Sequence, residues 1–135
     1  MAFQFSTAAR NAALDAIETA IGTGAVLKIR SGTVPATVAT ADAGTVLATL
    51  TLPSDWLAAA SGGSKAKAGT WEDTAADATG TAAHFRIYAS DGTTAHIQGT
   101  VTATGGGGDM TLDNTSIASG QAVTVTSFTL TAGGA

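Results

Sequence analysis

The stretch AAHFRIYASDGTTAHIQGTVT, residues 82–102, alternates apolar and polar side chains on both sides of a Ser90-Asp91-Gly92 turn. A two-residue period is typical of a half-buried strand. Gly92 suits the left-handed position of a type I turn followed by a bulge, so the stretch predicts a β-hairpin. The expected cross-strand pairs are Phe85–Ile97 and Ile87–Ala95 on the apolar face, and Arg86–His96 and His84–Gln98 on the polar face. The separation of the two sets predicts one buried and one exposed side.

Other parts of the chain repeat this period. Four further strands are expected, at residues 25–30, 46–52, 109–113 and 122–131. In the first of them, Lys28 and Arg30 are expected on the outer face. In the last, the apolar phase shifts by one residue at Thr126 and Ser127, which predicts a bulge or bend.

Residues 6–21 predict the one helix. Ser6 can cap its first turn, and Gly22 and Gly24 can end it. An apolar stripe at spacings of three and four runs along it, made of Ala9, Ala13, Leu14, Ile17 and Ile21. Phe3 and Phe5 precede the helix as a short strand or an extended arm, and residues 1–5 are candidates for ordering only on assembly.

Two segments between the expected strands are less regular. Residues 54–57 predict a helical turn capped by Ser54, with Trp56 filling the core. Residues 60–81 are rich in Gly, Ala, Ser and Thr and predict a long loop with at most one strand, residues 66–71. A loop of this length is usually functional or mobile, and this one is a second candidate for ordering on assembly.

These elements predict one mainly β domain over residues 1–135. Short strands separated by turn signals favour an antiparallel β-sandwich or jelly roll, here with an N-terminal arm and one N-terminal helix at about residues 6–21. A chain of 135 residues is long enough for one core and short for two.

Composition limits the classes of function. Only 12% of the residues are charged and the net charge is −4, which disfavours binding to a nucleic-acid backbone. The chain has no cysteine, so disulfides and thiolate metal sites are excluded. Its first residues lack the pattern of a signal peptide, and no apolar run is long enough to cross a membrane. We therefore expect a protein that folds in the cytoplasm of the cell that makes it, with no nucleic acid or membrane as partner.

Ligand types and their spacing give little indication of a metal site. His84 and His96 are expected as diagonal neighbours on the hairpin, but a zinc site needs three or four ligands and no acid lies nearby in the sequence. Two acidic sets could offer oxygens to calcium but lack the spacing of a known loop: Asp109, Asp113 and Asn114, and Glu72, Asp73 and Asp77. Turn capping is the default role for both sets.

Other chemistry is equally weakly indicated. Trp56, Trp71 and Tyr88 could line a carbohydrate site, but core packing explains them more simply. Gly105–Gly108 lacks the Lys-Ser/Thr of a phosphate loop. Lys65 and Lys67 are expected as an exposed basic pair, with an acidic neighbour in an assembly as the alternative. We expect no catalytic, cofactor-binding or metal-binding residue, no cofactor, and no enzymatic activity.

Three segments carry a resemblance to a known group. The run HFRIYASDGTTAHIQGTVT, the following GGGGDMTLDNTSIASGQAVTVTSFTLTAG and the early FSTAARNAALDAIETAIGTGAVLKIRSG together resemble small virion proteins of tailed bacteriophages. The resemblance implies a jelly-roll cement or decoration protein on the capsid surface of the virion. Its partners would be the major capsid protein and copies of itself, as a homo-oligomer such as a dimer.

Two alternatives stay open. The first is a virion protein of the tail, neck or fibre. The second is a carbohydrate-binding β-sandwich for host attachment, which requires exposed aromatic side chains.

Overall fold

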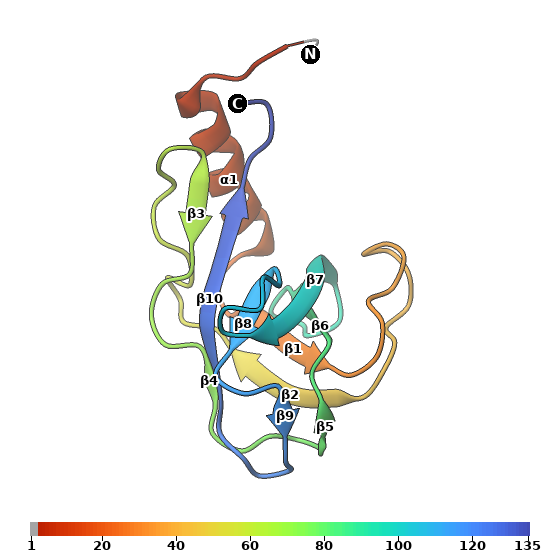
Figure 1. The fold of residues 1–135 in the computed structure, drawn as a ribbon. Coiled ribbons are helices and arrows are strands. Elements are labelled where there is room, and N and C mark those ends of the chain that lie inside the picture. The colour runs from red at the N-terminus through yellow and green to blue at the C-terminus, as the bar shows by residue number, and fades with distance from the viewer. Residues whose placement is uncertain (1–2) are drawn as a thin grey trace.

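The computed structural model describes residues 3–135, which form one helix and a curled β-sheet (Figure 1). The mainly β class with one N-terminal helix is confirmed. The elements are α1 (Thr7–Ile21), β1 (Val26–Arg30), β2 (Val46–Thr51), β3 (Ser64–Ala66), β4 (Glu72–Asp73), β5 (Gly80–Thr81), β6 (His84–Tyr88), β7 (Ala95–Ala103), β8 (Met110–Leu112), β9 (Ser116–Ile117) and β10 (Val123–Thr131).

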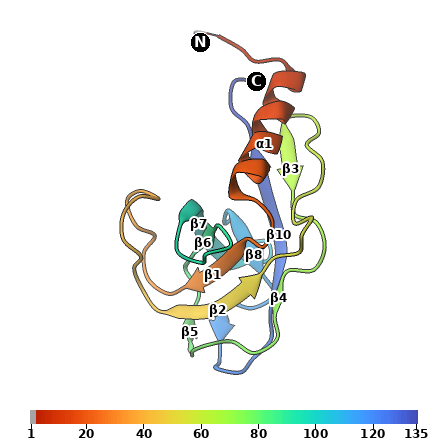
Figure 2. The ribbon, with the colours of Figure 1, turned by 180° about the vertical axis from the view of Figure 1, so that it is seen from behind.

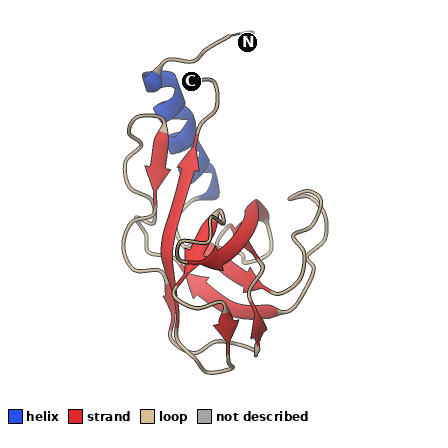
Figure 3. Cartoon of the chain, viewed as in Figure 1, coloured by secondary structure: helices blue, strands red, loops and turns tan. Residues whose placement is uncertain are grey.

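The main sheet is mixed. Its strand order is β2-β1-β6-β7-β8-β10-β3, β4 pairs with the lower part of β10, and β5 and β9 form a separate two-stranded sheet. The expectation of purely antiparallel pairing is wrong at one place, because β7 and β8 run parallel. The curl of the main sheet wraps it around a single core, which is consistent with the predicted sandwich or jelly roll (Figure 3).

The predicted hairpin is present as β6 and β7, but its register differs by two residues. Phe85 lies opposite Gly99 and Ile87 opposite Ile97. The connection is longer than expected because the Asp91 carboxylate accepts hydrogen bonds from the backbone of Thr93 and Thr94. A shift by an even number of residues leaves the side chains of residues 84–87 and 97–100 on their predicted faces. A bulge after Ile87 shifts the register once more, so Ala95 lies opposite Tyr88 and not Ile87.

Aromatic side chains fill the middle of the core. The ring centroids of Trp56 and Trp71 lie 6.0 Å apart, those of Trp71 and Phe128 5.6 Å, and those of Phe128 and Phe85 5.5 Å. The core position predicted for Trp56 is confirmed, because its side chain is fully buried. The helical turn predicted at residues 54–57 is wrong: Ser54 and Asp55 form an ordinary turn.

The segment predicted as a long loop contains three short strands, β3 to β5, and none of them spans residues 66–71 as expected. It also joins the two ends of the curled sheet. Asp73 accepts a hydrogen bond from the backbone N–H of Thr49 (2.9 Å), and Asp77 accepts one from the Thr49 hydroxyl (2.7 Å). β2 is an edge strand of the main sheet, with β1 on one side and no strand on the other. These two carboxylates therefore bond to an edge strand.

The helix packs beside β3, at one edge of the main sheet. α1, β3 and the upper part of β10 project from one end of the molecule, and the C-terminus lies there, whereas β5 and β9 lie at the opposite end (Figures 1 and 2). The predicted helix and its ends are confirmed. Ser6 accepts a hydrogen bond from the Ala9 N–H (3.1 Å), and Gly22 follows the last turn with a positive φ of 85°.

The other predicted strands are also present. β1, β2, β8 and β10 occupy four predicted segments, and the register of β10 shifts between Val125 and Ser127, as its sequence phase predicts. Residues 3–5 of the arm do not form a strand, although the Phe5 N–H donates to the Gly134 carbonyl (2.7 Å). The first two residues of the predicted arm lie outside the described residues.

Candidate functional site

The polar face of the hairpin is covered, contrary to expectation. The loop of residues 31–45, named the strap below, lies over β1, β6 and β7, and Arg30 is only 6% exposed. The strap is anchored by one carboxylate. Asp42 accepts from Arg30 (2.9 Å), Arg86 (2.7 Å) and the Tyr88 hydroxyl (2.8 Å). The predicted outer position of Arg30 is therefore wrong, because a buried guanidinium needs a paired charge and the strap supplies it.

Further hydrogen bonds hold the strap along its length. Gln98 donates to the Pro35 carbonyl (2.8 Å), and Arg86 donates to the Thr37 carbonyl (3.1 Å). The Nδ1 atom of His84 lies 2.8 Å from the Gly32 carbonyl oxygen. Since each contact joins the strap to the sheet, the cluster fixes a loop.

The pKa of Asp42 reflects this clamp. Partial desolvation raises it, but hydrogen bonds from Tyr88 and Arg86 and the charges of Arg30 and Arg86 outweigh that effect. The pKa therefore lies below the usual value for an aspartate. The pKa of the Tyr88 hydroxyl is raised, mainly by burial and also by its hydrogen bond to Asp42.

The two histidines are not neighbours. His84 is buried opposite Thr100, whereas His96 is exposed near the turn. The side chains of residues 3–135 contain no group of three His, Cys, Asp or Glu residues that could hold a metal ion.

The four aspartates considered for calcium make hydrogen bonds within the fold. Asp109 accepts from the backbone N–H of Thr100 (2.9 Å), and Asp113 accepts from that of Asn114 (2.9 Å). Asp73 and Asp77 bond to β2, as described above. Asp113 has the turn role that was the default prediction, and Asp73 also accepts from the backbone N–H of Ala75 (3.0 Å). Asp109 and Asp77 instead bond to strands distant in the chain.

The two lysines of the predicted basic pair lie in different environments. Lys67 bonds to the Gly69 carbonyl (2.9 Å), but Lys65 is 3% exposed and is not a surface residue as expected. Its ammonium group lies 2.6 Å from Asp15 and 2.8 Å from Glu18, both on α1. Burial lowers the pKa of Lys65, but the hydrogen bonds and charges of these two carboxylates raise it by more. The net shift of the pKa is therefore upward.

This ion-pair cluster decides which face of α1 points inward. The inward face carries polar and charged groups beside Leu14 and Ile21, which are its only buried residues. Asn11 accepts from the backbone N–H of Gly63 (2.8 Å), and Asp15 and Glu18 bind Lys65.

The outward face of α1 is apolar, apart from two threonines near its ends. Ile17 is 40% exposed, so the predicted apolar stripe is only partly buried. A helix on the surface of a globular protein normally shows the opposite arrangement, with charges outward. The exposed residues of α1, apart from Asp15, are Thr7, Ala8, Ala9, Ala12, Ala13, Ala16, Ile17, Thr19 and Ala20.

The arm extends this apolar face. Phe3 and Phe5 are 63% and 51% exposed, and their rings stack edge to face with centroids 5.2 Å apart. Together with Ile17 they account for three of the four large apolar side chains exposed in the described residues; the fourth is Val38 on the strap. We name the outward side of α1 together with Phe3 and Phe5 the apolar helix face.

A groove of about 350 Å³ lies on one flank of this face. Its lining is mostly apolar and comes from the arm, α1 and the C-terminal tail. The lining residues are Phe5, Ala9, Arg10, Ala13, Ala132 and Gly133. No ion pair is formed by Arg10, unlike Arg30 and Arg86, within residues 3–135.

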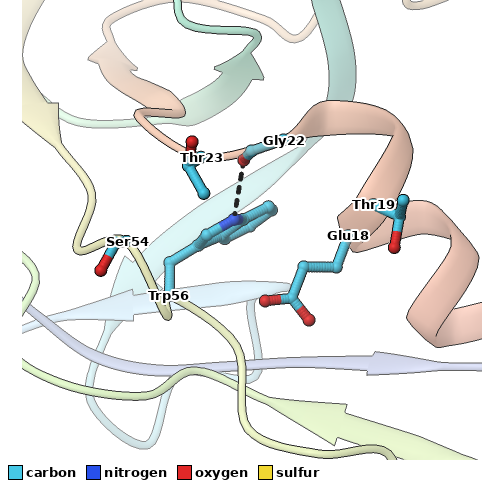
Figure 4. A pocket seen from close by; sticks show the side chains of 6 residues that line it. All are labelled: Glu18, Thr19, Gly22, Thr23, Ser54 and Trp56. Atoms are coloured by element: carbon cyan, nitrogen blue, oxygen red, sulfur yellow. Dashed lines mark hydrogen bonds between the residues drawn. The ribbon is translucent and has the colours of Figure 1, made fainter.

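A second hollow, of about 300 Å³, lies at the other end of α1 (Figure 4). It is lined by residues from the last turns of the helix and from the turn before β3, including Trp56, whose indole N–H donates to the Gly22 carbonyl (3.3 Å). Its one carboxylate, Glu18, is paired with Lys65. The hollow therefore offers no set of groups for acid–base or nucleophilic chemistry.

The aromatic side chains considered for carbohydrate binding are all buried. Trp56, Trp71 and Tyr88 have no exposed surface. None of the three offers a ring face on which a sugar could stack.

Sequence patterns were poor guides to the apolar helix face. The sequence shows that the helix is rich in alanine, which an apolar face requires. The orientation of the helix, however, depends on Lys65, which is 50 residues from Asp15 in the chain. No helix within the described range is long and apolar enough to cross a membrane.

Comparisons of the chain with protein-family models, with curated proteins and with solved structures give no match.

Replacing Asp42 with Asn should destabilise the fold by about 1–2 kcal/mol at pH 7, at the low end for charged hydrogen bonds because the carboxylate is 39% exposed. The native pKa of Asp42 is lowered, so its contribution is present above the unfolded value of about 3.9 and is lost as the pH falls below it. Urea unfolding between pH 7 and pH 2.5 should show the two proteins converging in acid. Asp55→Asn, at an exposed aspartate, should behave as wild type throughout. A gap that does not narrow between pH 7 and pH 2.5 would contradict the clamp.

Replacing Lys65 with Ala should loosen α1 while leaving the curled sheet intact, because Asp15 and Glu18 lose their shared cation. Amide hydrogen exchange in α1 should become about tenfold faster or more, with β1 and β6 unchanged. Lys67→Ala is the matched control, since Lys67 forms no ion pair with α1. Equal protection of α1 in both variants would show that Lys65 does not hold the helix.

Proposed function

We propose that this protein is a structural virion component of a tailed bacteriophage, a capsid cement or decoration protein that binds and stabilises the shell of major capsid protein. The observation that carries the assembly role is the apolar helix face. An exposed, uncharged helix side flanked by two exposed phenylalanines is typical of a surface that is buried against another chain.

The distribution of polar groups supports this role. The two acidic groups of α1, Asp15 and Glu18, bond to Lys65, and the polar face of the hairpin is occupied by the strap. A surface with few charges costs little to desolvate, so it suits contact with a large neighbour. Many modest contacts repeated by symmetry over a shell give high avidity.

The virion, the capsid and the major capsid protein enter through the resemblance of residues 5–32 and 84–133 to small phage virion proteins. The apolar helix face suits a tail or neck position equally well, and copy number per particle separates these positions. Hundreds of copies indicate the shell, whereas six or twelve indicate the neck or tail. A carbohydrate-binding role is less favoured, because Trp56, Trp71 and Tyr88 are buried.

The test is binding of the purified protein to capsids assembled without it. Wild-type protein should bind in hundreds of copies and raise the temperature at which the capsids open. Ala13→Glu should weaken binding at least about tenfold, because an unpaired carboxylate would be buried, while glutamate is still a good helix former.

Ala118→Glu is the matched control, since it adds the same charge at an exposed alanine that directly follows β9, and β9 lies at the opposite end of the molecule from α1. Capsids that gain no protein and no thermal tolerance would refute the cement role. Equal capsid binding by both variants would show that the apolar helix face is not the surface that contacts the capsid.

A further inference from the structure

α1 carries a projection and a recess on the same flank. The projection is Ile17, an isoleucine with 40% of its surface exposed. The recess is the groove of about 350 Å³ two turns closer to the N-terminus, between Ala9, Ala13 and the C-terminal tail. The two features lie on one helix, so a single chain cannot bring them together.

Helix geometry fixes their relation. Successive residues are rotated by about 100°, so Arg10 and Ile17 are displaced in the same direction from Ala13, by about 60° and 40°. Ala9 and Ile17 lie equally far from Ala13 on either side, about 6 Å each along the axis. Consider a two-fold axis that passes beside Ala13 and is perpendicular both to the helix and to the line joining the two helices. This axis makes the two helices antiparallel and leaves the Ile17 flank of each helix on the same side of the pair. It therefore places each Ile17 at the level of Ala9 in the other helix, on the groove side.

We propose that two copies of this chain pair through α1 in an antiparallel, two-fold arrangement, with Ile17 of each copy in the groove of the other. This proposal rests on the proposed function only in taking the apolar helix face as an assembly surface. It names a second copy as the occupant of that surface. A contact in which residue i meets residue j and j meets i is the usual form of a homodimer interface.

The side chains at the contact suit close approach. Ala13 meets Ala13 on the axis, and Ala9 leaves room for Ile17, so the helices can pack about 8 Å apart, the short end of the usual range. Phe5 forms one wall of the groove and Phe3 stacks on it, so the pairing also covers the exposed arm.

Charge does not oppose the pairing. The chain carries a net charge of −4, but no acidic residue lies on the contacting face. The two Arg10 side chains would be about 9 Å apart along the axis, close to a Debye length at physiological salt, so their repulsion is weak.

The contact is small. A pair of 15-residue helices buries less than the roughly 1,200 Å² of a stable complex, so the free protein should associate weakly and be strengthened by other contacts in a shell.

The absence of cysteine makes disulfide cross-linking a direct test. In full-length protein under mild oxidation, Ala13→Cys should form a covalent dimer at least about tenfold faster than Ala118→Cys, because the bond requires α-carbons within about 7 Å. A mixture of Ala9→Cys and Ile17→Cys should give the mixed dimer. Neither variant alone should cross-link, since like residues would be about 12 Å apart along the axis.

Sedimentation equilibrium of the unmodified chain should show association that is lost in Ile17→Ala and Ala13→Glu but kept in Ala118→Glu. Efficient self-cross-linking of Ala9→Cys would indicate parallel helices and overturn the proposal, as would failure of Ala13→Cys to dimerise faster than Ala118→Cys. Pairing without capsid binding would refute the proposed function alone. Capsid binding that depends on Ala13 in a chain that never pairs would refute the pairing alone.

Discussion

Buried charges must be paired, and this requirement organises the molecule. The chain has six basic residues, and three of them, Arg30, Lys65 and Arg86, are almost fully buried. Each has a carboxylate within 3 Å, supplied by Asp42 or by Asp15 and Glu18. Removing one partner of such a pair leaves an uncompensated charge in a poorly solvated place, so these contacts bind the strap and α1 to the rest of the fold.

The same pairing shapes the surface. Because α1 turns Asp15 and Glu18 toward Lys65, its alanines and Ile17 are left facing outward. A helix held by ionic contacts on its inner side therefore presents an apolar outer side, the reverse of an ordinary surface helix. In a monomer this arrangement would expose apolar surface for no gain. In an assembly it provides a contact that is cheap to desolvate.

The polar groups of the fold have similarly local roles. Asp73 and Asp77 bond to β2, Asp91 closes the hairpin turn, and Asp42 clamps the strap. Their hydrogen bonds are made to the protein itself, which is how a structural role uses carboxylates. This use of polar groups, together with the outward apolar residues, supports the proposed assembly role, whereas the virion enters that proposal through the sequence resemblance.

Local pattern alone determined the mainly β class, the helix with its Ser6 cap and Gly22 end, most strand positions, and the bulge in β10, because each depends on neighbours in the chain. Tertiary structure decided the rest. The burial of Arg30 and Lys65 depends on carboxylates 12 and 50 residues away, and the parallel pairing of β7 with β8 depends on how the sheet curls. Tertiary structure also decided which face α1 turns outward. A stripe of alanines can be buried or exposed, and only the long-range ion pairs with Lys65 select between the two.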